Sequence, residues 1–331
     1  MKRLGIVSIF MAIFVFGTLS PAVVSAQTPI PWPEKWWPSK WGQDDEKGAF
    51  NTMTPGKVLS AMKLVKTGKM YRLGIPYTKD IPLPWGRSYS LVIPGLPVGG
   101  PFGKNGCVWN DEFMAGELGQ VGTQFDGPGH IGIRGPDGVD RWYNGRALGQ
   151  DYRNAHGLLQ DGVEKVGPCI TRGVLIDVAG LKGVKAMEKG EVITVADVEA
   201  CIKKAGIEPI GEGDAVIFHT GWTSYWKDPA KFNAGEPGIG IEVAKYLIKK
   251  NIAMVAADSW AVDVVPGETK DLVFEIHQLM QTVNGIWYLE NLSDAALKEL
   301  VKDGAYEFLW VFVPVPFAGA TGSPGDAIAI R

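Results

Sequence analysis

Strand-like apolar runs alternate with helical segments from residue 173 to the end of the chain. The expected buried strands are "GVLIDVA" (173–179), "DAVIFHT" (214–220), "IAMVAAD" (252–258), "GIWYLEN" (285–291) and "YEFLWVFVPV" (306–315). The expected helices are "TVADVEACIKKAG" (194–206), "IGIEVAKYLIKKN" (239–251) and "SDAALKELVKDG" (293–304). Helices that alternate with buried strands cover a sheet, so this half of the chain predicts an α/β fold.

The first half of the chain is richer in strands and loops. Short strand-like runs broken by Gly and Pro fill residues 71–170, and residues 31–51 form an aromatic, proline-rich segment that is typical of an extended arm. A helix is predicted after Thr54, which would cap it, and before Gly68, which would end it. No repeat or linker divides the chain, so residues 27–331 are interpreted as a single domain, with the N-terminal arm and helix over 27–70.

Residues 1–26 have the features of a secretory signal peptide. Lys2 and Arg3 precede an apolar run, and Val24 and Ala26 occupy the small-residue cleavage positions, which makes Gln27 the expected mature start. An uncleaved anchor helix is the alternative. The interpretation predicts a periplasmic or secreted protein that has no membrane contact after cleavage of the signal.

Composition excludes several classes of function. A formal charge of −3 without a basic face argues against a nucleic-acid partner. Cys107, Cys169 and Cys201 are too few and too far apart for a disulfide framework; one pair could form, and the sequence does not say which. The chain lacks a Walker A motif, a GxGxxG motif, an HExxH motif and a GxSxG nucleophile elbow, so the usual signatures of nucleotide binding and serine-hydrolase chemistry are missing.

The segment "GQVGTQFDGPGHIGI" (119–133) is where chemistry is expected. Its glycines permit sharp turns, so Asp126 and His130 can converge although they are four residues apart. Carboxylate oxygen and imidazole nitrogen are both ligands for a divalent ion. From the residues alone, an Asp and a His in a glycine-rich loop are more often hydrogen-bonding partners that stabilise the loop.

This loop resembles the signature of the metal-dependent cyclase family, the kynurenine formamidase-like hydrolases. The signature reads H-x-G-T-H-x-D-x-P-x-H, and the chain reads Q-V-G-T-Q-F-D-G-P-G-H from Gln120 to His130. Four further segments resemble the longer bacterial members, in the same order along the chain: 41–74, 214–222, 252–263 and 275–292. In the third of these, Ala261 replaces a serine of the family pattern.

The resemblance implies a swivelling β/β/α fold with helices packed on a mixed sheet, assembled as a homo-oligomer. It also implies a divalent ion, Mn or Zn, bound by Asp126, His277 and Glu290, with His130 either as a further ligand or as the catalytic base. The implied reaction is the hydrolysis of a small amide, ester or lactone by a metal-activated water. The rival interpretation is an exported small-molecule-binding protein that keeps the fold and has a degenerate metal site.

Gln120 and Gln124 occupy positions where the family signature has histidine. They would bind the metal through oxygen, which shifts the preferred ion towards Mn²⁺, or they would hydrogen-bond the substrate or a metal-bound water. In the third alternative no metal binds.

The remaining site predictions concern substrate binding, for which the candidates are Phe125, His219, Trp222 and Trp226. The aromatic side chains would line an aromatic pocket or fill the core. His219 would be a pocket wall or a hydrogen-bonded core residue. Asp258 and Asp263 would either orient the site or cap a turn, with the structural role favoured, and His156 is interpreted as a surface loop residue.

Overall fold

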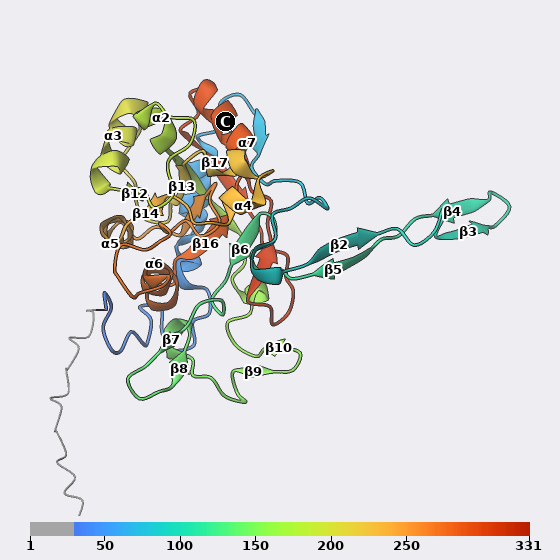
Figure 1. Cartoon of the computed structure of the whole chain (residues 1–331), viewed down its shortest axis with the longest axis horizontal. Coiled ribbons are helices and arrows are strands. Elements are labelled where there is room, and N and C mark those ends of the chain that lie inside the picture. Colours follow the sequence, from blue (N-terminus) through green and yellow to red (C-terminus); the bar gives the residue numbers. More distant parts are fainter. Residues whose placement is uncertain (1–29) are drawn as a thin grey trace, which may run out of the picture.

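The computed structural model describes residues 30–331, so the proposed signal peptide lies outside the described residues. A mixed sheet forms the centre of the molecule (Figure 1). Its neighbouring strands are, in order, β1 (Met70–Arg72), β19 (Ile328–Ile330), β17 (Glu307–Phe312), β11 (Cys169–Asp177), β13 (Ala215–His219), β15 (Met254–Ala257), β16 (Trp287–Glu290), β6 (Gln124–Asp126) and β18 (Gly322–Pro324). Strands β11, β13, β15 and β16 are parallel, and antiparallel strands complete both edges. The expected α/β class with a mixed sheet is confirmed.

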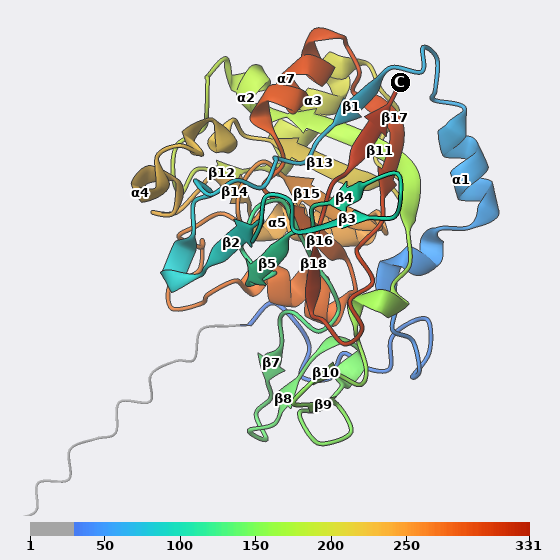
Figure 2. The ribbon, with the colours of Figure 1, turned by 90° about the vertical axis from the view of Figure 1, so that its right-hand side faces the viewer.

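Helices cover both faces of this sheet (Figure 2). On one face, α3 (Val195–Ala205) and α5 (Ile241–Lys249) contribute buried side chains such as Val198 and Leu247 to the core. On the other face, α7 (Asp294–Lys302) contributes Leu297 and Leu300. The other helices are α1 (Pro55–Met62), α2 (Val178–Lys182), α4 (Pro229–Phe232) and α6 (Glu275–His277), and the short 3-10 turns are η1 (Gly48–Thr52), η2 (Pro84–Gly86), η3 (Tyr143–Gly145), η4 (Val163–Lys165) and η5 (Trp222–Tyr225).

Two predicted element boundaries move inward in the structure. The first helix begins after Thr54, as expected, but it ends at Met62 instead of continuing towards Gly68. Ala61 is its only buried residue, so no apolar face holds the last expected turn against the body. The last strand expected from the sequence, β17, ends at Phe312, before Pro314, because proline has no N–H for the ladder.

A long two-stranded ribbon over residues 89–116 projects from the body (Figure 1). Strand β2 (Tyr89–Val92) pairs with β5 (Phe113–Gly116), and further out β3 (Gly99–Phe102) pairs with β4 (Cys107–Trp109). At its root, the Ser88 backbone N–H donates to the Glu117 carboxylate over 2.6 Å and ties the two stems together. The remaining short strands are β7 (Ile133–Arg134), β8 (Asp140–Arg141), β9 (Arg153–Asn154), β10 (Gly157–Leu158), β12 (Val192–Ile193) and β14 (Gly238–Ile239).

The three cysteines are free thiols, Cys107 exposed and Cys169 and Cys201 buried. Among residues 30–331, no helix has the length and apolar character that are needed to cross a membrane.

Candidate metal centre

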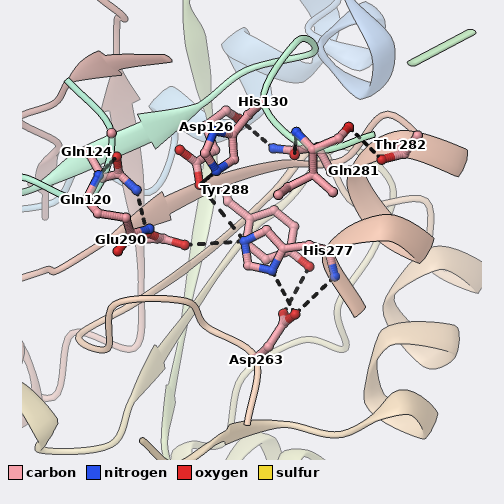
Figure 3. Close-up of polar contacts among 12 residues, drawn as sticks. Gln120, Gln124, Asp126, His130, Asp263, His277, Gln281, Thr282, Tyr288 and Glu290 are labelled. Carbon is pink, nitrogen blue, oxygen red and sulfur yellow. Dashed lines mark hydrogen bonds and ion pairs between the residues drawn. The ribbon is translucent and has the colours of Figure 1, made fainter. Parts of the chain in front are cut away.

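Two adjacent strands bring polar side chains to one face of the sheet (Figure 3). Strands β6 and β16 are antiparallel neighbours, with Gln124 opposite Glu290 and Asp126 opposite Tyr288. Because successive side chains of a strand point to opposite faces, residues two apart on each strand share a face. This register places four polar side chains together inside a buried part of the molecule.

Asp126, His277 and Glu290 form the centre of this cluster, and one ligand atom from each lies within 4.8 Å of the others. The His277 Nε2 atom is 3.3 Å from Glu290 Oε1 and 3.9 Å from Asp126 Oδ2. Neither carboxylate oxygen of Asp126 has a hydrogen-bond partner, although both are buried. An unpartnered buried carboxylate is costly unless a cation or a proton compensates it. The donor set therefore fits a metal ion.

Asp263 sets the orientation of His277. Its Oδ2 atom accepts a hydrogen bond from the His277 backbone N–H over 3.0 Å and lies 2.7 Å from Nδ1, so Nε2 is left facing the cluster. Burial by itself would lower the pKa of His277, but Asp263 and Glu290 raise it well above its usual range. The Tyr288 ring stacks on the imidazole with a centroid distance of 4.0 Å. Of the two roles open for Asp263, the contacts match the one in which it orients the site, although the structural role was favoured from the sequence.

Gln120 and Gln124 hold Glu290. The Nε2 atoms of both donate to Glu290 Oε2, over 2.7 Å and 2.6 Å. The Gln124 Oε1 atom accepts the Gln120 backbone N–H over 2.5 Å, whereas Gln120 Oε1 is buried without a partner. None of the three alternatives for this pair included a hydrogen bond to the Glu290 carboxylate, which is what the structure shows for both amides. The oxygen of Gln124 is already engaged by the Gln120 backbone. The side-chain oxygen Oε1 of Gln120 is available to bind a cation.

His130 lies where the cluster meets solvent, with Nε2 3.4 Å from Asp126 Oδ2. Burial lowers the pKa of His130, and the Asp126 carboxylate only partly opposes this. Burial raises the pKa of Asp126 to about 7, with His130 opposing and Glu290 adding to the rise. A His130 imidazole that is neutral near pH 7 is able to accept a proton from water.

A π-helix, η6 (Gln278–Val283), holds the glycine-rich loop in place. The side chain of Gln281 donates to the Asp126 carbonyl over 3.0 Å and accepts the Ile131 backbone N–H over 3.2 Å. Thr282 donates to the Ile131 carbonyl over 2.8 Å. π-Helices are rare and occur frequently at functional sites.

A cavity of about 180 Å³ connects the cluster with solvent. Its lining residues are Trp85, Arg87, Gln120, His130, Ile131, Ala261, Phe274 and His277. Trp85 packs edge-on against Trp260 with a centroid distance of 5.4 Å. The buried Glu236 carboxylate accepts the backbone N–H groups of Trp260, over 2.5 Å, and Ala261, over 2.7 Å, and so fixes this wall.

Strained backbone marks the same walls. Gln120, Val262 and Phe274 have φ values of +59°, +61° and +53°. Left-handed backbone is a genuine outlier for a β-branched residue such as Val262, which lies between a cavity residue, Ala261, and Asp263. No sequence pattern connects Trp85, Arg87, Glu236 and Phe274, so sequence reasoning did not find them.

The four predicted substrate-binding residues lie outside the cavity lining. Phe125 points away from the cluster and packs between Phe50 and Phe312. Trp222 is buried and donates to the Phe232 carbonyl over 3.2 Å, and Trp226 packs on the Phe232 ring. These contacts correspond to the alternative in which the aromatic residues fill the core.

Both ring nitrogens of His219 are engaged, Nδ1 with Asp177 over 2.7 Å and Nε2 with Asp294 over 2.9 Å. Burial would lower the pKa of His219, but the two aspartates raise it to about 10. His219 is therefore a hydrogen-bonded core residue in this structure. Its neighbour Asp258 accepts the Thr220 backbone N–H over 2.7 Å, and His156 is exposed.

The family model described as "Putative cyclase" matches residues 71–264, which is more than half of the chain. The chain belongs to the cyclase family. A crystal structure of a novel cyclase is 29% identical, has a TM-score of 0.76, and the match covers 88% of this chain and 96% of that one. Membership confirms the resemblance carried by the loop from Gln120 to His130.

Two more distant structures share the cyclase fold. Isatin hydrolase A from Ralstonia solanacearum is 20% identical, with a TM-score of 0.57 and coverage of 80% of this chain and 92% of that one. An isatin hydrolase bound to the product analogue thioisatinate is 20% identical, with a TM-score of 0.53 and coverage of 84% and 100%. No curated protein matches the chain.

Proposed function

We propose that this cyclase-family chain is a metal-dependent hydrolase that cleaves a small amide, ester or lactone. The observation that carries the proposal is the buried Asp126 carboxylate, which has no hydrogen-bond partner and lies beside His277 and Glu290. The fold is shared with proteins named isatin hydrolases, which supports hydrolysis as the reaction class.

Asp126, His277 and Glu290 would hold the ion. Gln120 Oε1 is a buried oxygen without a hydrogen-bond partner, on a residue that lines the same cavity. A set with more oxygen than nitrogen donors favours Mn²⁺ over Zn²⁺. When bound, the ion would supply a Lewis acid that lowers the pKa of water and polarises the carbonyl.

The chain's own residues would transfer the proton and hold the metal ligands in position. His130, neutral near pH 7, accepts at Nε2 the proton of the attacking water and returns it to the leaving nitrogen or oxygen. Asp263 keeps His277 Nε2 turned towards the cluster, and Gln120 and Gln124 hold Glu290.

Metal analysis of protein that was purified without chelator, together with hydrolysis assays on N-formyl compounds and lactones, tests the proposal. We expect Asp126→Ala and His277→Ala each to abolish metal retention and hydrolysis while circular dichroism shows an intact fold. The control His156→Ala changes an exposed histidine and should keep both properties.

Absence of bound metal and of metal-stimulated turnover in the parent protein would overturn the proposal and favour the binding-protein alternative. Metal retention by both alanine variants would show instead that the ligand assignment is wrong.

A further inference from the structure

Arg87 lies in the wall of the cavity without a carboxylate partner among residues 30–331. Its Nε atom donates to the Gly119 carbonyl over 2.7 Å, and its guanidinium lies 5.3 Å from the Trp85 ring centroid. By contrast, Arg134 and Arg141 each pair with an aspartate. Among the residues that line the cavity, Arg87 is the only lysine or arginine.

Anchoring at Nε leaves the two terminal nitrogens of Arg87 for a ligand. A planar guanidinium group can form two parallel hydrogen bonds with a carboxylate. A guanidinium that is already fixed by another hydrogen bond loses less conformational entropy when it binds this ligand. Trp85 is 62% exposed, and Phe274 lies on the same lining, so flat apolar surface is adjacent to this charge. An exposed tryptophan at a cavity mouth is suited to stacking with a planar ring.

We propose that Arg87 binds a carboxylate of the substrate while Trp85 and Phe274 contact its ring. The substrate is then an aromatic acid whose cleaved carbonyl reaches the Asp126–His277–Glu290 cluster. This inference rests on the proposed hydrolase function and adds the substrate class to it.

Benzoate and benzamide provide a binding test because they have the same shape and differ in charge. Titration of the purified protein in the presence of a chelator, monitored by calorimetry, should show benzoate binding more tightly than benzamide, by on the order of 10-fold or more. Arg87→Gln should abolish this difference and Arg87→Lys should retain part of it. The matched control is Arg153→Gln, which changes an exposed arginine on β9. Equal binding of the two compounds to the parent, or a preference that survives Arg87→Gln, would overturn the assignment.

A kinetic comparison separates this inference from the proposed function. With N-formylanthranilate and its methyl ester as substrates, Arg87→Gln should raise KM for the acid alone and leave kcat nearly unchanged. An equal fall of kcat for both compounds would mean that Arg87 acts on the reacting carbonyl, which contradicts the assignment. A protein that binds no metal and hydrolyses no compound of the N-formyl and lactone panel, yet still prefers benzoate through Arg87, would refute the hydrolase function and keep the binding site.

Discussion

Glu290 is the residue on which the arrangement of the candidate centre depends most. Burial raises its pKa, while His277 and the two glutamines oppose the rise. Sequence reasoning predicted that Asp126, His277 and Glu290 converge, because the family resemblance covers both the signature loop with Asp126 and the segment 275–292 with His277 and Glu290. It did not predict that Gln120 and Gln124 donate to one oxygen of Glu290, since the direction of an amide depends on the partners that folding brings to it.

Removal of one of these amides should weaken the centre. We expect Gln124→Leu to lower the free energy of unfolding by about 1–3 kcal/mol, because Glu290 Oε2 loses a buried donor. Urea denaturation of metal-free protein measures this loss, and Gln43→Leu, outside the cavity lining, is a matched control. An unchanged unfolding midpoint would show that the hydrogen bond contributes nothing.

The role of His130 is open to a direct test. If it is the base, His130→Asn should reduce kcat by about 10²–10⁴-fold and leave the bound metal in place. Elemental analysis and steady-state kinetics on the same preparation provide the measurement. Loss of metal from this variant would instead make His130 a ligand.

At the scale of the elements, the apolar periodicity of the sequence predicted the strands of the central sheet but not the loops that form the cavity walls. The runs at 252–258 and 285–291 formed β15 and β16, because buried strands need apolar side chains on both faces. The cavity walls come from loops with left-handed backbone at Gln120, Val262 and Phe274, which tertiary packing imposes.

His219 joins three elements, since Asp177 ends β11, His219 ends β13 and Asp294 begins α7. The pKa of His219 is about 10 in the folded chain, against about 6.5 when unfolded. This interaction therefore stabilises the fold fully below about pH 6.5 and is lost as the pH rises towards 10. Between about pH 6.5 and 10, we expect the free energy of unfolding to fall by a few kcal/mol more in the parent than in His219→Gln. Urea denaturation at several pH values measures this difference. Parallel profiles would contradict this account.

At the scale of the whole molecule, the N-terminal segment belongs to the core. The aromatic, proline-rich run suggested an extended arm, yet it buries Trp36 and Phe50, and the Lys47 carbonyl accepts the Trp287 indole N–H over 2.9 Å. The projecting ribbon was not predicted, because its strand-like runs are broken by Gly and Pro and carry no signal for pairing with one another.

A chain that starts at Thr54 should therefore fail to fold or lose most of its stability. Removal of one buried Phe or Trp side chain costs about 3–5 kcal/mol, and a typical domain has only about 5–15 kcal/mol in total. Thermal unfolding followed by circular dichroism, with the chain from Gln27 as control, measures the loss. Cooperative unfolding near the control's Tm would show that the segment is dispensable.

The polar cluster and the outer wall of the cavity belong to parts of the molecule that can change independently. Strand β6 lies between β16 and β18, so its backbone is bonded on both sides and Asp126 moves only if the sheet moves. Trp85 and Arg87 lie instead on the stem that leads into the ribbon, and neither bonds to a residue of the cluster. Substitution of these two residues would change specificity and leave the reaction centre in place, which makes this stem the natural target for directed evolution.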